Sequence, residues 1–375
     1  MGFYSTFLNK FKRITDSGNY MPEIDGLRFI AVFLIAFMMH IGNLLLPAQL
    51  GVSSRGNYIY QLLLWEAGYG VQLFFIISGF ILALPFAKEK LQRQKKVDLK
   101  NYYWKRVTRI EPLYIITMIL YFAMRVYLLH YNTFMELLPN FFASIFYVHN
   151  IVYNSASAIN GVAWSLEVEV QFYLLAPLLT QIYWVKNALI RRCILLFFII
   201  FSTILFSKNQ FVNPVTLIDK INFFLCGILL ADLYLLRKKE NNGLLIALLA
   251  IVVFGIYLFI PTIEHVNNYL SLMKIFAVTL LFYTAITNSH LKRLLSVKIV
   301  AIIGGMCYSI YLLHMGIYGI LRHKFFYTNF FGNITLNIIF LYCLAVVIVL
   351  IISGIFFLLI EKPTMKKNWY KKNGN

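Results

Sequence analysis

Two ionisable side chains interrupt a long apolar run near the start of the chain. Arg28 and His40 both lie in the run 26–46, which is long enough to cross the hydrocarbon core of a bilayer. A helical rise of about 1.5 Å per residue separates them by roughly 18 Å along the axis. Because such side chains are costly in hydrocarbon, they predict chemistry with a fixed cation near one membrane face and a base nearer the other. The alternative is structural, with Arg28 reaching back to the interface and His40 hydrogen-bonded in the packing.

Two carboxylates occur in a later apolar segment. Glu167 and Glu169 lie two residues apart in the run 162–184, so on a helix they diverge by about 200° and cannot act as a close pair. We expect one of them at the outer interface and Glu169 deeper, where it must be protonated or find a cation. A carboxylate can orient and strengthen a histidine base, so we predict that Glu169 contacts His40. The alternative is a protonated glutamic acid that bridges two helices.

A third set of candidate residues is basic. Lys105, Arg106 and Arg109 end a polar interval and precede an apolar run, and in a helix Arg109 shares a face with one of the other two. Guanidinium groups stay charged and bind phosphate oxygens through paired hydrogen bonds. We therefore predict that Arg106 and Arg109, with Lys105, bind phosphate on the cytoplasmic side. The basic residues between Lys88 and Lys100 are expected only to hold their loop inside.

The composition indicates the class of protein that must position these residues. Of the 375 residues, 60% are hydrophobic and only 13% are charged. Soluble chains carry about 25% charged residues, so the chain is a polytopic membrane protein. We predict an all-α bundle of about ten transmembrane helices. The predicted spans are 26–46, 68–87, 112–130, 162–184, 193–207, 221–236, 244–260, 269–286, 299–320 and 336–361.

The basic residues predict the orientation of these spans. If the N-terminus is cytoplasmic, 26 lysines and arginines lie on cytoplasmic segments and 5 on outer loops, which is a strong positive-inside bias. Both termini are therefore expected inside. The apolar segment 134–148 is expected to be an interfacial or re-entrant helix, because another crossing would move the basic segment 186–192 outside. The predicted organisation is a cytoplasmic tail (1–25) without a removed signal peptide, a transmembrane domain (26–361) and a basic cytoplasmic tail (362–375).

The charge and the cysteines argue against other classes of protein. Most of the net charge of +19 lies where anionic lipid of the inner leaflet would attract it, and no nucleic-acid-binding motif accompanies it. We therefore expect membrane lipid, and no nucleic acid, as a partner. The four cysteines fall singly in predicted spans, so neither a disulfide set nor a metal site is expected.

Five segments, in this order, resemble the integral-membrane acyltransferase-3 family, the O-acyltransferases of cell-surface glycans. The resemblance covers nearly the whole chain. It implies a multi-pass protein of the cell inner membrane that moves an acyl group, above all acetyl, from cytoplasmic acyl-CoA to a hydroxyl of a glycan such as lipopolysaccharide O-antigen or exopolysaccharide. The segments are PEIDGLRFIAV with the histidine at position 40 (22–40), GVQLFFIISGF (70–80), KRVTRIEPLY (105–114), WSLEVEVQFYLL (164–175) and YSIYLLH (308–314).

The family pattern also implies roles for individual residues. Its first-span histidine, here His40, is the base, and we predict that Glu169 assists it while Arg28 steadies the donor. Ser165 or a tyrosine would donate a hydrogen bond to the developing oxyanion. Acyl-CoA, in particular acetyl-CoA, is a co-substrate, and neither a bound cofactor nor a metal is implied. We expect direct transfer and leave a covalent acyl-serine or acyl-histidine route open. Supporting residues in the matching segments are Trp164, Ser78 and His314.

The sequence departs from the family pattern in the spacing of its first span. The family places ten residues between the basic residue and the histidine, whereas eleven stand between Arg28 and His40. One extra residue rotates His40 by about 100° unless a local bulge absorbs it. In addition, Gln72 stands where an acidic residue is common, and the chain ends soon after the tenth predicted span, so no further extracytoplasmic domain is expected.

A rival interpretation comes from another class of protein. A transporter or flippase of a glycan or lipid-linked intermediate would also have about ten spans and buried charges that bind protons or substrate. Many transporter folds are built from internal repeats, and the two halves of this sequence show none.

Overall fold

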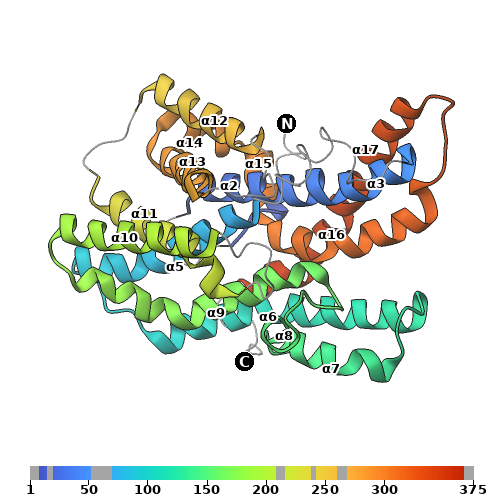
Figure 1. The fold of residues 1–375 in the computed structure, drawn as a ribbon, viewed down its shortest axis with the longest axis horizontal. Helices are drawn as coiled ribbons and strands as arrows, with labels where there is room; N and C mark the ends of the chain where they lie inside the picture. The colour runs from blue at the N-terminus through green and yellow to red at the C-terminus, as the bar shows by residue number, and fades with distance from the viewer. Residues whose placement is uncertain are drawn as a thin grey trace.

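The computed structural model describes residues 8–14, 20–51, 70–207, 216–237, 242–259 and 268–366. Within these ranges the regular structure is helical, without a β-strand, and long helices lie alongside one another in an elongated bundle (Figure 1). The predicted all-α membrane bundle is confirmed. The elements are α2 (Pro22–Val32), η1 (Phe33–His40), α3 (Ile41–Leu50), α5 (Gly70–Leu91), α6 (Leu99–Ala123), η3 (Met124–Leu128), α7 (Phe134–Ile145), α8 (His149–Tyr153), η4 (Gly161–Ala163), α9 (Trp164–Leu179), η5 (Thr180–Trp184), α10 (Ala188–Ser207), α11 (Leu217–Leu235), α12 (Leu244–Phe259), α13 (Asn268–Thr287), α14 (Ser289–Leu295), α15 (Lys298–Gly305), α16 (Cys307–Leu321), η6 (Arg322–Phe326), α17 (Ile334–Phe356), η7 (Phe357–Glu361) and α18 (Lys362–Thr364).

The predicted number of membrane-spanning helices is not reached among the described residues by length and composition alone. Among the described residues, seven helices are long and apolar enough to cross a membrane, and the bent pair formed by α15 with α16 and η6 makes an eighth candidate. The predicted count of about ten is therefore not confirmed. The two other predicted spans correspond to α12, which has 16 residues, and to α11, which carries Asp219, Lys220 and Asp232. The helix α7 has only 12 residues, too few for a crossing. The inside location of both termini and the limits of the two tails stay predictions.

The first membrane helix changes its hydrogen-bonding pattern halfway along. The helix α2 begins at Pro22, which suits a first helical turn. It continues as η1, a π-helical segment that ends at His40, and the amide of Ile41 bonds to the carbonyl of Ala36, five residues earlier. A π-helical turn holds one residue more than an α-helical turn. The segment η1 is therefore the local bulge that the spacing between Arg28 and His40 requires.

Two neighbouring helices stabilise this π-helical segment. The hydroxyl of Tyr318 on α16 donates to the carbonyl of Ala36 (3.1 Å), and that of Tyr342 on α17 donates to the carbonyl of Phe37 (2.8 Å). Carbonyls in a π-helix form poorer intrahelical bonds than those in an α-helix, so side-chain donors from outside offset the loss.

The basic segment before the third span is helical. The helix α6 begins at Leu99, well before the predicted span at residue 112, and Asp98 caps it by accepting hydrogen bonds from the amides of Lys100 (3.0 Å) and Asn101 (3.4 Å). The expected shared face of the basic residues is therefore present, because positions 105, 106 and 109 lie on one continuous helix.

Glycines allow the closest helix crossings in the bundle. Where α5 meets α11, a Cβ atom on Gly79 would lie 2.4 Å from the carbonyl oxygen of Phe224, and one on Gly227 would lie 2.4 Å from that of Ile76. Small residues let membrane helices approach at backbone distance.

The ninth predicted span is broken. The helices α15 and α16 meet at Met306 with an angle of 67°. Just before the bend, a Cβ atom on Gly304 would lie 1.7 Å from the carbonyl oxygen of Asp25, so only glycine fits this contact with α2. The bend turns α16 along the first membrane helix, and this brings His314 to η1.

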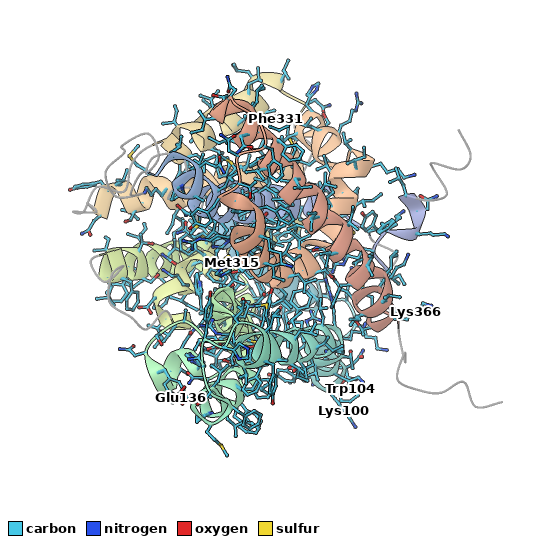
Figure 2. The ribbon with its side chains drawn as sticks, turned by 90° about the vertical axis from the view of Figure 1, so that its right-hand side faces the viewer. Lys100, Trp104, Glu136, Met315, Phe331 and Lys366 are labelled. Carbon is cyan, nitrogen blue, oxygen red and sulfur yellow. The ribbon has the colours of Figure 1, made fainter. Side chains whose placement is uncertain are left out.

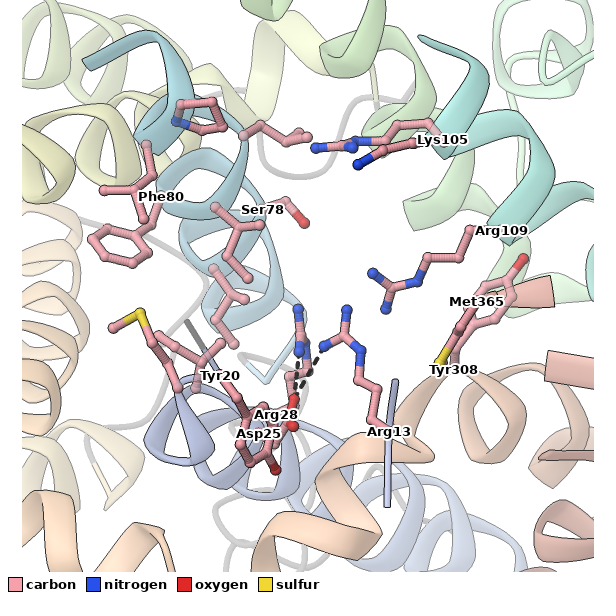
Figure 3. A pocket seen from close by; sticks show the side chains of 18 of the residues that line it. Arg13, Tyr20, Asp25, Arg28, Ser78, Phe80, Lys105, Arg109, Tyr308 and Met365 are labelled. Atoms are coloured by element: carbon pink, nitrogen blue, oxygen red, sulfur yellow. Dashed lines mark hydrogen bonds and ion pairs between the residues drawn. The ribbon is translucent and has the colours of Figure 1, made fainter. Parts of the chain in front are cut away.

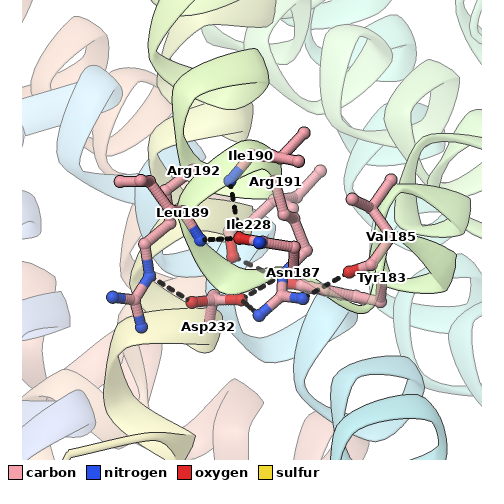
Figure 4. A network of polar contacts seen from close by, with 9 residues as sticks. All are labelled: Tyr183, Val185, Asn187, Leu189, Ile190, Arg191, Arg192, Ile228 and Asp232. Carbon is pink, nitrogen blue, oxygen red and sulfur yellow. Dashed lines mark hydrogen bonds and ion pairs between the residues drawn. The ribbon is translucent and has the colours of Figure 1, made fainter.

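One buried ionic network was not anticipated. Arg191 and Arg192, which we expected only to orient the chain, both pair with Asp232 of α11 (Figure 4). The Nε of Arg192 lies 2.7 Å from Oδ1 of Asp232, while Arg191 contacts Oδ2 and also donates to the carbonyl of Val185 (2.5 Å). Arg191 and Asp232 are almost completely buried, so the network fixes the start of α10 against α11.

Candidate active site

A cavity of ≈ 1270 Å³ lies between α2, α5, α6, α9 and α16. Basic side chains outnumber carboxylates three to one along its wall, so it suits a polyanion. The basic residues are Arg13, Arg28, Lys88, Lys95, Lys105, Arg106, Arg109, Lys292 and Lys366, and the acidic residues are Glu23, Asp25 and Glu169.

Exposed side chains also line this cavity. Trp104 on α6 and Lys366 beyond α18 both line it, and they lie on the same side of the bundle (Figure 2). Lys88 and Lys95 also line the cavity, a position that the expectation for the basic residues between Lys88 and Lys100 did not include.

Arg28 is held inside the cavity. Its side chain is 11% exposed, and its Nη1 donates to Oδ1 of Asp25 (2.5 Å), the same oxygen that accepts from Arg13 (3.1 Å). Figure 3 shows the three side chains together at the cavity wall. Arg28 therefore does not reach out to the interface, as the structural alternative required, but adds charge to the cavity.

The three predicted donor-binding residues face the same space. Lys105, Arg106 and Arg109 all line the cavity, and Figure 3 shows Lys105 and Arg109 directed into it from α6. The guanidinium of Arg106 lies 4.8 Å from the ring centroid of Tyr102, a cation–π contact that fixes its position. The structure thus gathers residues far apart in sequence, Arg28 and the basic face of α6, around one volume.

Glu169 belongs to this cavity and not to the histidine. Its Oε1 accepts hydrogen bonds from the hydroxyl of Ser78 and from that of Tyr173 (2.5 Å). The expected contact with His40 is not made. Two residues along α9, Glu167 is fully buried and accepts from the amide of Asn150 (2.8 Å), so the expectation that one carboxylate faces the outer interface is also wrong. The two-residue spacing predicts the helical divergence but not which helices cover each face.

His40 is hydrogen-bonded to the second intramembrane histidine. Its Nδ1 lies 2.8 Å from Nε2 of His314, and the two rings stack with centroids 4.9 Å apart. The Nδ1 of His314 lies 3.0 Å from the carbonyl oxygen of Ile310. A carbonyl can only accept, so Nδ1 of His314 carries the proton and its Nε2 accepts. In the neutral pair, His40 must then donate through Nδ1, which leaves the lone pair of its Nε2 free to act as a base.

A hydroxyl pair separates the cavity from the histidines. Ser165 and Tyr311 both line the cavity, and their hydroxyl oxygens lie 2.7 Å apart. The ring of Tyr311 is 5.8 Å from that of His314 and 6.0 Å from that of Phe74. These side chains therefore form the inner end of the cavity next to the histidine pair. Trp164 packs edge-on against the ring of Phe75 (6.2 Å), a supporting contact beside it.

Sequence reasoning missed three features of this arrangement. It placed Arg13 in a cytoplasmic tail, gave Tyr173 no role and did not pair the two histidines. Only the last of these features had a signal in the sequence. In YSIYLLH, Tyr311 and His314 lie three residues apart, so they share a helix face. Among the described residues, no three histidine, cysteine or acidic side chains gather as metal ligands would.

Comparison with known proteins identifies the family of the chain. The family model described as an acyltransferase domain matches residues 21–372. The O-acetyltransferase OatA of Staphylococcus aureus is 27% identical over 96% of this chain and 60% of its own length. The peptidoglycan O-acetyltransferase OatA of Listeria monocytogenes is 28% identical over 46% of this chain and 26% of its own length. The chain thus spans about three fifths of the S. aureus relative, and no solved structure matches it significantly. Because the family model covers nearly the entire sequence, the chain belongs to the acyltransferase-3 family.

Proposed function

We propose that this chain is an integral-membrane O-acetyltransferase that moves an acetyl group from cytoplasmic acetyl-CoA to a glycan hydroxyl. The observation that carries the proposal is the single cavity in which a surplus of basic side chains leads to a hydroxyl pair against two hydrogen-bonded histidines. The names of both relatives, which are O-acetyltransferases, support the same reaction.

The basic side chains that line the cavity, called the basic wall below, would bind the donor. CoA carries phosphate groups at one end, and charge-assisted hydrogen bonds from guanidinium groups are well suited to them. Arg106 and Arg109, with Lys105, would bind these phosphates from α6, and Arg28 would steady the donor deeper in the cavity. Glu169 would have a different role from the one first expected. It lies near Arg28 and Arg106 and is fixed by two hydroxyl donors, so it would balance their charge and position Tyr173 and Ser78.

The histidine pair would supply the proton chemistry. The Nε2 of His40 would take the proton of the acceptor hydroxyl as the hydroxyl oxygen attacks the thioester carbonyl. His40 would then be an imidazolium that still donates from Nδ1 to Nε2 of His314, so His314 stabilises the charge and orients the ring. When the tetrahedral intermediate collapses, the carbon–sulfur bond breaks, the thiolate of CoA takes the proton from His40, and the acetylated glycan leaves.

The developing oxyanion needs a hydrogen-bond donor. Ser165 and Tyr311 are at the inner end of the cavity, and each hydroxyl carries one proton to donate. The hydroxyl of Tyr311 can donate to the carbonyl of Val162 (3.0 Å) in the absence of substrate and turn toward the oxyanion when the thioester is bound. This arrangement supports direct transfer.

The acceptor is proposed only as a cell-surface glycan. One relative is named a peptidoglycan O-acetyltransferase, whereas our sequence interpretation named lipopolysaccharide O-antigen and exopolysaccharide. All three offer sugar hydroxyls, and the cavity residues distinguish none of them. We place the protein in the cell inner membrane, where its basic segments would meet cytoplasmic anionic lipid.

Transfer of label separates the proposal from its rival, a transporter or flippase. Purified protein in liposomes receives radiolabelled acetyl-CoA on one side and a panel of glycans on the other, and the glycans are analysed by mass. An acetyltransferase gives a glycan heavier by one acetyl group that carries the label. Label that crosses the membrane without a covalent product, or a glycan that crosses unmodified, would instead identify a carrier.

A further inference from the structure

Arg13 lies outside the membrane helices but inside the donor cavity. It belongs to the short described segment 8–14 that precedes α2, yet its side chain is only 10% exposed and lines the cavity. Figure 3 shows its guanidinium and that of Arg109 directed toward the same space from opposite walls. The segment is therefore a part of the cavity wall, and not a tail that serves only to orient the chain.

Some hydrogen-bond donors around Arg13 have no acceptor among the described residues. Arg13 and Arg28 share one oxygen of Asp25, and Arg109 adds a third guanidinium that makes no hydrogen bond within the described part of the chain. The buried Nε of Arg13 has no hydrogen-bond partner there either. Burial, together with the charges of Arg109 and Arg28, lowers the pKa of Arg13 to about 9. Buried guanidinium donors without an acceptor are costly, and a bound anion would supply acceptors.

We propose that Arg13, Arg28 and Arg109 form the subsite for the diphosphate of the CoA donor, so that the segment before the first membrane helix completes the donor site. This inference rests on the proposed acetyl transfer. Three guanidinium groups directed into one space (Figure 3) offer paired donors to the several oxygens of a diphosphate, more than a single phosphodiester would use.

The length of the donor supports the diphosphate over the more distant 3′-phosphate. Arg28 and His40 lie on one membrane helix, at most roughly 18 Å apart along its axis. The pantetheine arm from diphosphate to thioester has about a dozen bonds, and at about 1.2 Å of advance per bond it spans roughly 15 Å when extended. A diphosphate at the three arginines would therefore bring the thioester to His40. The 3′-phosphate would lie farther out, where Lys88, Lys95 and Lys366 line the cavity.

The test uses three ligands and a matched pair of variants. Binding of CoA, dephospho-CoA and pantetheine is measured by calorimetry on protein in nanodiscs of zwitterionic lipid. Arg13→Ala is compared with Lys10→Ala, an exposed residue of the same segment. We expect Arg13→Ala to weaken CoA and dephospho-CoA equally, on the order of tenfold to a hundredfold, and to leave pantetheine unchanged. Lys10→Ala should bind all three ligands as the wild type does.

Several outcomes would overturn the inference. Unchanged CoA binding in Arg13→Ala would mean that Arg13 only pairs with Asp25 and does not bind the donor. A loss for CoA but not for dephospho-CoA would assign Arg13 to the 3′-phosphate, and an equal loss for pantetheine would indicate a collapsed site. Arg13→Lys, which keeps the charge near Asp25, checks this last point, since it should fold normally and bind CoA with intermediate affinity.

Lipid binding by the same variants shows whether Arg13 binds a lipid phosphate or a phosphate of the donor. If Arg13 holds an anionic headgroup, Arg13→Ala would change binding of phosphatidylglycerol to the protein and leave CoA affinity in zwitterionic nanodiscs unaltered, which would contradict the inference. Failure of the wild-type protein to bind CoA at all would instead refute the proposed function.

Discussion

The π-helical segment η1 should set the register of His40, and changes in its length test this directly. Removing Phe33, whose side chain is 38% exposed, leaves ten residues between Arg28 and His40, and an unbroken α-helix then holds His40 where it now lies. We expect acetyl transfer to stay within about tenfold of the wild type, since a well-formed α-helix replaces the strained turn. Inserting one alanine after Phe33 should have the opposite effect.

The size of the insertion effect follows from helix geometry. One extra residue rotates His40 by about 100°, which on a helix of about 2.3 Å radius moves its Cα by roughly 3.5 Å. The 2.8 Å hydrogen bond to His314 cannot survive that displacement. A misplacement of about 1 Å can already cost a hundredfold in rate, so the insertion should lower transfer at least about a hundredfold.

Turnover and donor binding must be measured together to interpret these two variants. Rates of acetyl transfer in liposomes report the register, while acetyl-CoA affinity reports the basic wall, which neither change touches. An inactive deletion together with an active insertion, both binding donor normally, would refute the role of η1.

Three further predictions follow from the site and its supports. His314→Ala should lower the transfer rate about 10–150-fold at unchanged acetyl-CoA affinity, because a hydrogen bond to a charged group is worth about 1.5–3 kcal/mol. Wild-type turnover in this variant would show that His314 only packs against His40. Arg106→Ala should weaken acetyl-CoA binding by about 1.5–3 kcal/mol while Lys100→Ala, exposed and outside the cavity, has no effect; equal small losses would mean that the charge serves orientation only. Asp232→Ala leaves a buried arginine unpaired and should cost about 3–5 kcal/mol in the free energy of unfolding, seen as a lower midpoint of thermal denaturation; an unchanged midpoint would remove its structural role.

Much of this architecture could be predicted from local patterns in the sequence. Long apolar runs require helices in a bilayer, because every backbone polar group must be satisfied internally. Buried ionisable residues are costly, so Arg28, His40 and Glu169 stood out before any contact was known. The basic face of α6 followed from the three- and four-residue spacing of Lys105, Arg106 and Arg109. These signals are local. In the structure, Arg28, Glu169 and the basic face of α6 line one cavity, and His40 is not among its lining residues.

The partners of these residues could not be predicted in the same way. The pairing of His40 with His314 depends on the 67° bend at Met306 and on the π-helical turn, and both arise from packing between distant segments. Asp232 lies in an apolar predicted span, and only the structure shows that it pairs with two arginines. The predicted count of spans is not confirmed, because α11 carries charged residues and the described α12 has 16 residues, although both are apolar enough to resemble crossings in sequence.

The central claim is that His40 is the base of an acetyl transfer whose donor binds in the basic cavity. The most direct measurement is single-turnover transfer from radiolabelled acetyl-CoA to a glycan by wild-type and His40→Ala protein in liposomes, with acetyl-CoA affinity measured on the same samples. The account predicts that His40→Ala binds acetyl-CoA as the wild type does and transfers its label about 10²–10⁴-fold more slowly. Wild-type transfer by folded, donor-binding His40→Ala protein would contradict it.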